Sequence, residues 1–300
     1  MPELEPKYGV CDEPLVAVEQ PESRQPAMAS LLVGQRSLIA QRRGRYVAGS
    51  TAHPDRMAPD LAATLIRDYT HAGDLVVDPF AGVGTTLIEA VHAGRDALGV
   101  DCDPGWVALT RANLALARRN GATGHSQILR GDATQLPNGV PRELRGAASL
   151  VLTAPPSRRT MPGRSQRVRA SATPPAPPGR SCRRDRVDLI DGITAVLLGC
   201  VPLLKPGGLI VLVSTPPPRD RILDAVSDRI VQQVAADLNV VARWHAAHAV
   251  LGDGQLTPYG ARRQTRVVTT RGDNEAAVAI RYDDIVVLSP EATRVTRRRP

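Results

Sequence analysis

The chain has 300 residues, of which 42% are hydrophobic and 23% are charged. This composition excludes a fibrous, collagen-like or wholly disordered protein, and the length suffices for one large domain or two small ones. The net charge of +8 equals the excess of residues 157–186, which hold nine arginines and one acid. The last ten residues add four arginines and one acid, so the remainder of the chain is mildly acidic.

The sequence contains no run of about 18 apolar residues, so we expect no membrane span. Its first residues lack the basic and apolar regions of a signal peptide. The four cysteines, at positions 11, 102, 182 and 200, show no paired spacing, which indicates neither a disulfide framework nor a zinc site. We therefore expect a cytoplasmic protein that holds no metal.

In chain order, residues 1–50 form an N-terminal extension that we expect to be partly disordered, with a short helix over 28–39. Apolar residues at helical spacing then predict a helix that begins near Pro59. A glycine turn separates the buried strand 75–77 from a helix through Leu87. The later elements are strand 97–100, helix 106–119, strands 127–129 and 149–152, helix 189–204, strand 209–213, helix 221–238, and strands near 240–250, 266–270 and 278–288.

Strands that alternate with helices predict an α/β, Rossmann-like fold. We expect a doubly wound, mostly parallel sheet with an antiparallel strand at one edge. This domain spans residues 51–290 and contains an Arg/Pro-rich loop at 157–186, and a basic tail follows at 291–300. Lysine occurs only at Lys7 and Lys205, a bias that GC-rich coding also produces, so a solvated loop and a nucleic-acid contact are both open interpretations of the arginines.

The most informative motif is residues 78–86, which read Asp-Pro-Phe-Ala-Gly-Val-Gly-Thr-Thr directly after a strand. Glycines at a strand-to-helix turn let a ligand approach the backbone, and the helix start behind them offers free N–H groups. Leu87 occupies the place where a dinucleotide fingerprint needs a third small residue, which disfavours NAD.

Two more acids, Asp101 and Asp132, follow the next two strands, as Asp78 follows the first. Three strand-end carboxylates around a glycine turn suit an adenosine that carries an amino acid, which is S-adenosylmethionine. The alternative is three unrelated acids in strand-to-loop connections.

Several segments resemble the DNA methylase family, whose members use S-adenosylmethionine to methylate N4 of cytosine or N6 of adenine. They are 53–57 (His-Pro-Asp-Arg-Met), 78–86, 94–95 (Gly-Arg), 99–101 (Gly-Val-Asp) with Trp106, and 131–132 (Gly-Asp). The turn at 205–208 (Lys-Pro-Gly-Gly) is similar to the one before the fifth strand of Rossmann-like class I methyltransferases.

The resemblance implies a class I methyltransferase domain over 51–290 and assigns roles to single residues. Asp78, Gly82 and Gly84 would hold the methionine end of the cofactor, Asp101 the ribose, and Asp132 would lie near the adenine. His53 would lie beside the cofactor. The full set of expected cofactor-binding residues is Asp78, Phe80, Gly82, Gly84, Thr85, Asp101 and Asp132.

The catalytic motif departs from the family pattern, which places Ser, Asp or Asn, then Pro-Pro and an aromatic residue, at the end of the fourth strand. An exocyclic amine is a poor nucleophile, so a side-chain acceptor and a backbone carbonyl must draw on its hydrogens. The aromatic residue stacks on a base rotated out of the helix. This chain has Ala154, Pro155, Pro156 and Ser157 as its candidate catalytic residues. Because side chains alternate along a strand, we expect Thr153 to point elsewhere than Ala154.

Three functions are compatible with these residues. The first is an S-adenosylmethionine-dependent methyltransferase that acts on exocyclic amino groups of DNA bases. The second is a cofactor-binding but catalytically inactive relative with a DNA-binding or regulatory role. The third is an RNA methyltransferase of the guanine-N2 type. Such enzymes have an Asp-Pro-Pro-Tyr motif, whose Asp and Tyr are also absent from this chain. In each case the expected partner is nucleic acid, with DNA favoured.

Overall fold

The computed structural model describes residues 29–32, 36–53, 57–156, 189–215, 226–247, 249–252, 255–258, 267–268, 277–278 and 282–290. Residues 1–28, Ser157, the arginine-rich loop at 157–186, His248 and the basic tail lie outside the described residues. Predictions that concern them therefore remain predictions.

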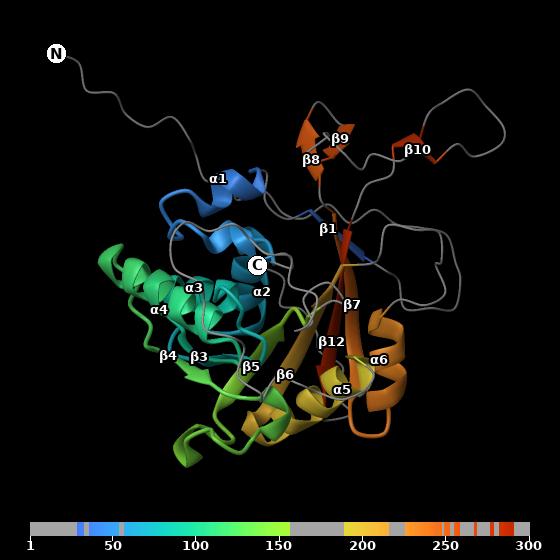
Figure 1. Cartoon of the computed structure of the whole chain (residues 1–300). Helices are drawn as coiled ribbons and strands as arrows, with labels where there is room; N and C mark the ends of the chain where they lie inside the picture. The colour runs from blue at the N-terminus through green and yellow to red at the C-terminus, as the bar shows by residue number, and fades with distance from the viewer. Residues whose placement is uncertain are drawn as a thin grey trace.

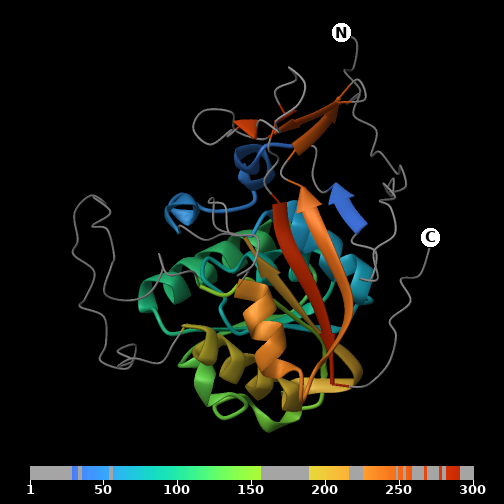
Figure 2. The same cartoon turned by 90° about the vertical axis from the view of Figure 1, so that its right-hand side faces the viewer.

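An eight-stranded sheet forms the centre of the molecule, in the order β1-β7-β12-β6-β5-β2-β3-β4. All neighbouring strands are parallel except β12, which runs antiparallel to both β6 and β7. Figure 2 shows β7 and β12 side by side, in orange and red. The strands are β1 Ala29–Leu32, β2 Leu75–Asp78, β3 Asp96–Asp101, β4 Ser126–Arg130, β5 Ala148–Thr153, β6 Leu204–Ser214, β7 Asn239–Ala247 and β12 Tyr282–Ser289.

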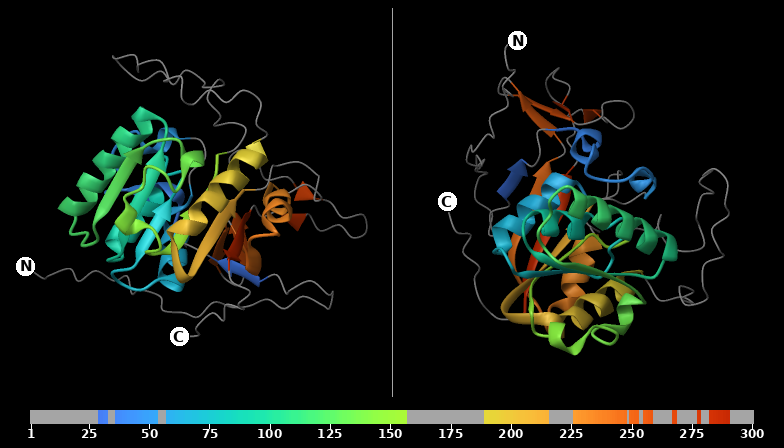
Figure 3. Two further views of the ribbon diagram at one scale, coloured as in Figure 1. Left: turned by 90° about the horizontal axis from the view of Figure 1, so that it is seen from below. Right: turned by 90° about the vertical axis from the view of Figure 1, so that its left-hand side faces the viewer.

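Helices cover both faces of this sheet (Figures 1 and 3). On one face α2, α3 and α4 pack against side chains such as Leu150 and Leu152, and on the other α5 and α6 pack against Val151 and Leu212. Two short strand pairs, β8 Ala249–Gly252 with β9 Gln255–Pro258 and β10 Val267–Val268 with β11 Ala277–Val278, lie outside the main sheet. The helices are α1 Leu38–Arg42, α2 Pro59–Tyr69, α3 Thr85–His92, α4 Pro104–Arg119, α5 Leu189–Cys200 and α6 Val226–Val234.

This arrangement confirms the predicted α/β, Rossmann-like fold with a doubly wound, mostly parallel sheet. The antiparallel strand β12 is third from one end of the sheet, between β6 and β7, and the parallel strand β1 forms the edge itself. The chain runs from β2 to β3 and β4 on one side, then returns to place β5 on the other side of β2. Ligands of doubly wound proteins bind at such a switch point, outside the carboxyl ends of the two strands. A ligand site is therefore expected at the carboxyl ends of β2 and β5.

Three predicted helices differ from the observed elements. The helix expected over 221–238 ends at Val234, and residues 221–225 lie outside the described residues. The helix expected over 28–39 is wrong, because Ala29–Leu32 forms strand β1, which pairs with β7, and α1 begins only at Leu38. Pairing with a strand 215 positions away (Ala29 with Trp244) is a tertiary interaction that local spacing does not reveal. The helix expected over 189–204 ends at Cys200, because Pro202 has no N–H to continue it, and a short 3₁₀ turn precedes β6.

No described helix combines the length and the hydropathy that crossing a membrane requires.

Candidate active site

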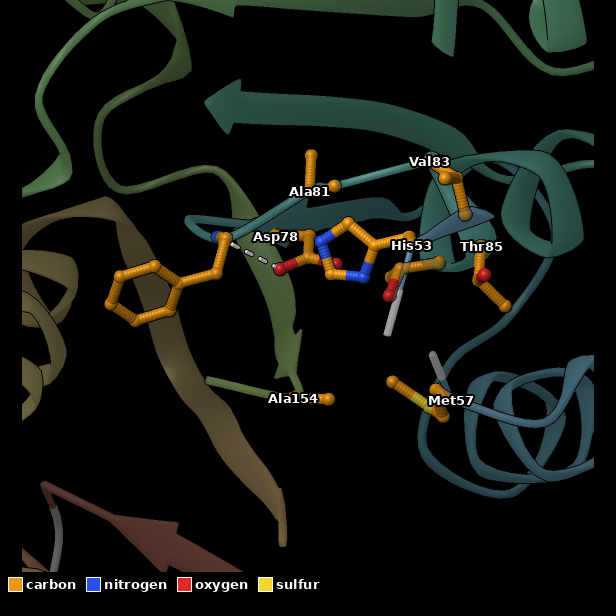
Figure 4. A pocket seen from close by; sticks show the side chains of 10 residues that line it. His53, Met57, Asp78, Ala81, Val83, Thr85 and Ala154 are labelled. Atoms are coloured by element: carbon orange, nitrogen blue, oxygen red, sulfur yellow. Dashed lines mark hydrogen bonds between the residues drawn. The ribbon is translucent and has the colours of Figure 1, made fainter. Parts of the chain in front are cut away.

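A pocket opens at the switch point between β2 and β5 (Figure 4). It brings together the upstream segment, the turn after β2 and the end of β5. Six residues of the sequence prediction line it, namely His53, Asp78, Phe80, Gly82, Thr85 and Ala154. Met57, Ala81, Val83 and Thr86 complete the lining.

The two glycines of the turn serve different purposes. Both have positive φ, +52° at Gly82 and +82° at Gly84. A Cβ on Gly82 would lie 3.3 Å from Nε2 of His53, so this glycine keeps the backbone close to the pocket. A Cβ on Gly84 would lie 2.7 Å from Cγ2 of Thr110, in the protein interior. The structure thus places Gly82 in the pocket wall and Gly84 against α4.

Two buried polar side chains of α4 hold the turn from behind. The hydroxyl of Thr110 donates to the carbonyl of Gly82 at 2.7 Å, and the amide of Asn113 donates to the carbonyl of Val83 at 2.9 Å. The carbonyl oxygen of the Asn113 side chain accepts the backbone N–H of Val47 at 2.8 Å. Neither residue lies in a motif, so the sequence alone does not indicate them. They fix the turn and the upstream segment to the same helix.

Asp78 is the buried carboxylate of the pocket. Its side chain is 4% exposed, and its Oδ1 accepts the backbone N–H of Phe80 at 3.0 Å and the hydroxyl of Thr153 at 2.8 Å. Burial raises the pKa of Asp78 to about 6, although hydrogen bonds from Thr86, Thr153 and Phe80 oppose the rise. The site therefore disfavours the lone negative charge, and a cationic ligand group would stabilise it.

Asp101, at the end of β3, binds the turn. Its Oδ2 accepts the N–H of Gly82 and its Oδ1 accepts the N–H of Asp103, both at 2.8 Å. Burial raises the pKa of Asp101 to about 6, against the effect of these two hydrogen bonds. A carboxylate has more acceptor positions than these two N–H groups use. Asp101 can therefore hold the turn and still accept a ligand hydroxyl.

Asp132 lies one strand further out, after β4. Its Oδ1 accepts the backbone N–H of Thr134 at 3.0 Å and the hydroxyl of Thr134 at 2.8 Å, so it caps the 3₁₀ turn Ala133–Gln135. It does not line the described pocket. The three strand-end acids thus share one edge of the sheet, but only Asp78 reaches the pocket directly.

The upstream segment is held over the turn by aromatic and ionic contacts. The His53 ring meets the Trp106 ring edge-to-face, with centroids 4.7 Å apart. Arg45 binds both carboxylate oxygens of buried Glu89 on α3, at 2.6–3.0 Å, and Tyr46 donates to the same carboxylate at 2.7 Å. Residues 36–53 thereby pack against α3 and α4, which explains how His53 reaches the pocket.

The end of β5 presents no polar side chain to the pocket. Ala154 lines it with a methyl group, and Thr153 instead turns its hydroxyl to Asp78. Side-chain alternation thus separates the two residues as expected, but the partnership of Thr153 with Asp78 was not predicted. The signal for it is the switch point itself, which makes β2 and β5 neighbours that end at the same edge.

His245 follows Trp244 on β7 and contacts two neighbouring side chains. The His245 ring stacks on Tyr282 with centroids 4.2 Å apart, and its Nε2 lies 3.7 Å from Oδ1 of Asp284. Within the part of the chain that the structure describes, no group of three or more His, Cys, Asp or Glu side chains could hold a metal ion.

A known protein family matches the segment that contains most of the pocket-lining residues. Residues 33–111 match the family model described as DNA methylase, and this range contains the upstream segment, the turn and Asp101. This segment is therefore similar to DNA methylases. The predicted resemblance is confirmed for the part of the chain that forms the pocket.

Two relatives of this segment are named for different activities. The type II methyltransferase M.MthZI of Methanothermobacter thermautotrophicus is 42% identical over 55 residues, which are 18% of this chain and 16% of the relative. The tRNA (guanine(10)-N2)-dimethyltransferase of the same species is 38% identical over 85 residues, 28% of this chain and 24% of the relative. The chain thus matches a quarter or less of the length of either relative. Among solved structures, TrmN from Thermus thermophilus has a TM-score of 0.48 and 19% identity, over 83% of this chain and 52% of that one.

Proposed function

We propose that this protein is a methyltransferase that transfers the methyl group of S-adenosylmethionine to exocyclic amino groups of DNA bases in the cytoplasm. The observation that carries the proposal is the shared pocket. Ala154, at the place of the family's catalytic acceptor, lines the same pocket as Gly82 and Asp78 of the turn. A methyl donor at the turn and a target amine at the end of β5 would therefore meet.

The residues present fit the cofactor. Asp78 is buried, and within the described part of the chain no basic side chain is among its hydrogen-bond partners, which suits the α-amino group of a methionine. The N-terminus of α3 starts at Thr85, where free N–H groups suit an anion. Asp101 has acceptor capacity left for a ribose hydroxyl, and Asp132 remains our candidate near the adenine. When bound, the cofactor supplies an electrophilic methyl group on a sulfonium.

Groups of the protein must accept hydrogen bonds from the target amine. Pro155 and Pro156 have no N–H, so the ladder of β5 ends at Thr153 and the carbonyls beyond it can face a substrate. The methyl group of Ala154 cannot accept a hydrogen bond. Loss of one stabilising partner of this kind typically costs about 10²- to 10³-fold in rate. We therefore expect slow transfer compared with an enzyme that has the acceptor.

The test is transfer of a tritiated methyl group to DNA. We expect slow, cofactor-dependent labelling of unmethylated DNA by the unaltered protein, and faster labelling by Ala154→Asn, which adds an acceptor. Ala154→Leu, of similar size but without polar atoms, is the matched control and should not gain activity. If neither the unaltered protein nor Ala154→Asn labels DNA, the proposal of DNA methylation is wrong.

The inactive alternative rests on the same position. Ala154 places only a methyl group in the pocket, and the neighbouring hydroxyl of Thr153 is already bound to Asp78. If the protein binds cofactor and DNA but transfers nothing, and only Ala154→Asn is active, it is an inactive relative with a binding role. The RNA alternative is favoured by the 85-residue match to a tRNA dimethyltransferase. Labelling of tRNA without labelling of DNA would establish it.

The proposed grip on nucleic acid is the arginine-rich loop at 157–186, which follows the two prolines directly in the sequence. Replacing its nine arginines by glutamine should weaken DNA binding and flatten the salt dependence, because fewer phosphates would be neutralised. An unchanged slope of log affinity against log salt would show that these arginines do not contact phosphates.

A further inference from the structure

We propose that Arg42, acting through Thr85, supplies the positive charge that holds the α-carboxylate of the bound cofactor at the start of α3. The inference rests on the proposed cofactor and adds a positioning residue outside the motifs of the sequence analysis. Arg42 is the last residue of α1, in the segment that precedes His53.

Arg42 is buried beside the pocket wall. Its side chain is only 7% exposed, and its Nη2 donates to the carbonyl of Met57 at 2.8 Å and lies 3.5 Å from the hydroxyl oxygen of Thr85. Met57 and Thr85 both line the pocket. The guanidinium carbon lies 4.7 Å from the centre of the Tyr46 ring. Nη1 is buried and has no hydrogen-bond partner within the described part of the chain.

Among the described residues, no carboxylate forms an ion pair with Arg42. The nearby carboxylate is Glu89, but Arg45 takes both of its oxygens and Tyr46 donates to it as well. Glu89 therefore lies near both arginines but forms its hydrogen bonds with Arg45 rather than with Arg42. Burial lowers the pKa of Arg42, although Tyr46 and Glu89 oppose the change. A buried cation is costly unless an anion accompanies it. The anion is missing from the described protein residues and is expected from a ligand.

The N-terminal turn of α3 likewise has no acidic side chain of its own. Its N-cap is Gly84, which offers no side chain, and its first turn contains no acid. The N–H groups of this turn therefore have no carboxylate among the helix's own capping residues. The hydroxyl of Thr85 has a single hydrogen to donate. Because Arg42 donates to its oxygen, that hydrogen remains available to a ligand in the pocket.

The ammonium and carboxylate groups of an amino acid would thus each lie near a side chain of opposite charge. Asp78 and Thr85 lie on either side of the His53 ring in Figure 4. Asp78 suits the ammonium group, and Thr85 with Arg42 behind it suits the carboxylate. Recognition of both charges would select an intact methionine moiety over a derivative that lacks one of them.

Calorimetry with two ligands tests this assignment. S-adenosylmethionine carries the carboxylate, and its decarboxylated analogue keeps the sulfonium, the amine and the adenosine. We expect the unaltered protein to prefer the carboxylated ligand by about 10- to 100-fold, the range for a charged hydrogen-bonded contact. Arg42→Met should remove most of that preference and leave binding of the analogue within about threefold. Arg42→Lys should restore part of it.

The matched control is Arg43→Met, the neighbouring arginine, which is exposed. It should retain the full preference. Thr85→Val removes the hydroxyl with little change of shape, so it should also reduce the preference, and it gives a result even if Arg42→Met fails to fold.

Equal weakening of both ligands in Arg42→Met, or an unchanged preference in Thr85→Val, would overturn the role of Arg42 and leave the cofactor proposal intact. Equal affinity of the unaltered protein for both ligands would do the same. If the unaltered protein binds neither ligand, the proposed function itself fails.

Discussion

The hydroxyl of Thr153 donates to Oδ1 of Asp78 at 2.8 Å, which joins the last residue of β5 to the last residue of β2. These strands are neighbours at the switch point of the sheet. The bond therefore connects the strand that carries the candidate catalytic residues to the acid that faces the proposed cofactor. It also stabilises the charged form of a carboxylate that burial disfavours.

Thr153→Val tests this connection. Loss of the donated hydrogen bond should raise the pKa of Asp78 further above about 6. A cationic ligand group needs the ionised carboxylate, so the affinity for S-adenosylmethionine should begin to fall at a higher pH than in the unaltered protein. Calorimetry from pH 5.5 to 8.5 measures this shift. Thr194→Val, on α5, is the control, and an equal pH midpoint in Thr153→Val and the unaltered protein would contradict the prediction.

Asp78→Asn should make the protein more stable at pH 8 and weaken its binding of the cofactor. Because the folded pKa of Asp78 is raised from 3.8 to about 6, the folded state holds its proton more tightly than the unfolded state. The ionised acid therefore lowers stability above about pH 6, and this penalty disappears as the pH falls toward 4. Asn avoids the penalty, so the variant should be about 1–3 kcal/mol more stable at pH 8 and gain nothing at pH 4.

Chemical denaturation at both pH values checks this prediction, and calorimetry should show that Asp78→Asn loses S-adenosylmethionine affinity at least about 10-fold. A variant that is less stable at pH 8 than the unaltered protein would indicate that the charge of Asp78 is already compensated within the fold.

Glu89→Gln should destabilise the protein strongly. Glu89 is 3% exposed and holds Arg45 and Tyr46 onto α3, so its loss leaves buried positive charge without an acid. Breaking a buried pair in this way typically costs about 3–5 kcal/mol. Urea unfolding is the measurement. Asp60→Asn, which removes an exposed pair with Arg36, should cost less than about 1 kcal/mol. Similar losses in both variants would show that the Glu89 cluster is not a structural centre.

Gly84→Ala should lower the free energy of unfolding by more than the strain of a positive φ accounts for. The residue has φ +82°, and its Cβ would lie 2.7 Å from Thr110 and 2.8 Å from Cδ1 of Ile88. Overpacking adds about 1–3 kcal/mol to the conformational strain. Gly44→Ala, at φ +70° with no atom within 4 Å of the Cβ, isolates the strain. Thermal unfolding should show the larger loss for Gly84→Ala, and equal losses would mean that α4 moves aside.

Local patterns of the sequence predict much of the core of this fold. The strand before Asp78, the glycine turn and the alternation of later elements are visible because each depends on spacing and on residue type over a few positions. The antiparallel strand near one edge follows from consecutive strands without helices between them. In contrast, residues 29–32 form a strand only because β7 is available beside them, and no local signal reveals that partner.

The sequence by itself determined the resemblance of the pocket segment to DNA methylases, the α/β architecture and the absence of a polar side chain at Ala154, because motifs and residue types are properties of the chain. Only the tertiary structure decided which residues act together. It placed Ala154 in the same pocket as Asp78, turned Thr153 toward that acid, and buried Arg42 behind Thr85. Such contacts join residues 43 to 76 positions apart, and they arise from strand order and packing, which local spacing does not encode.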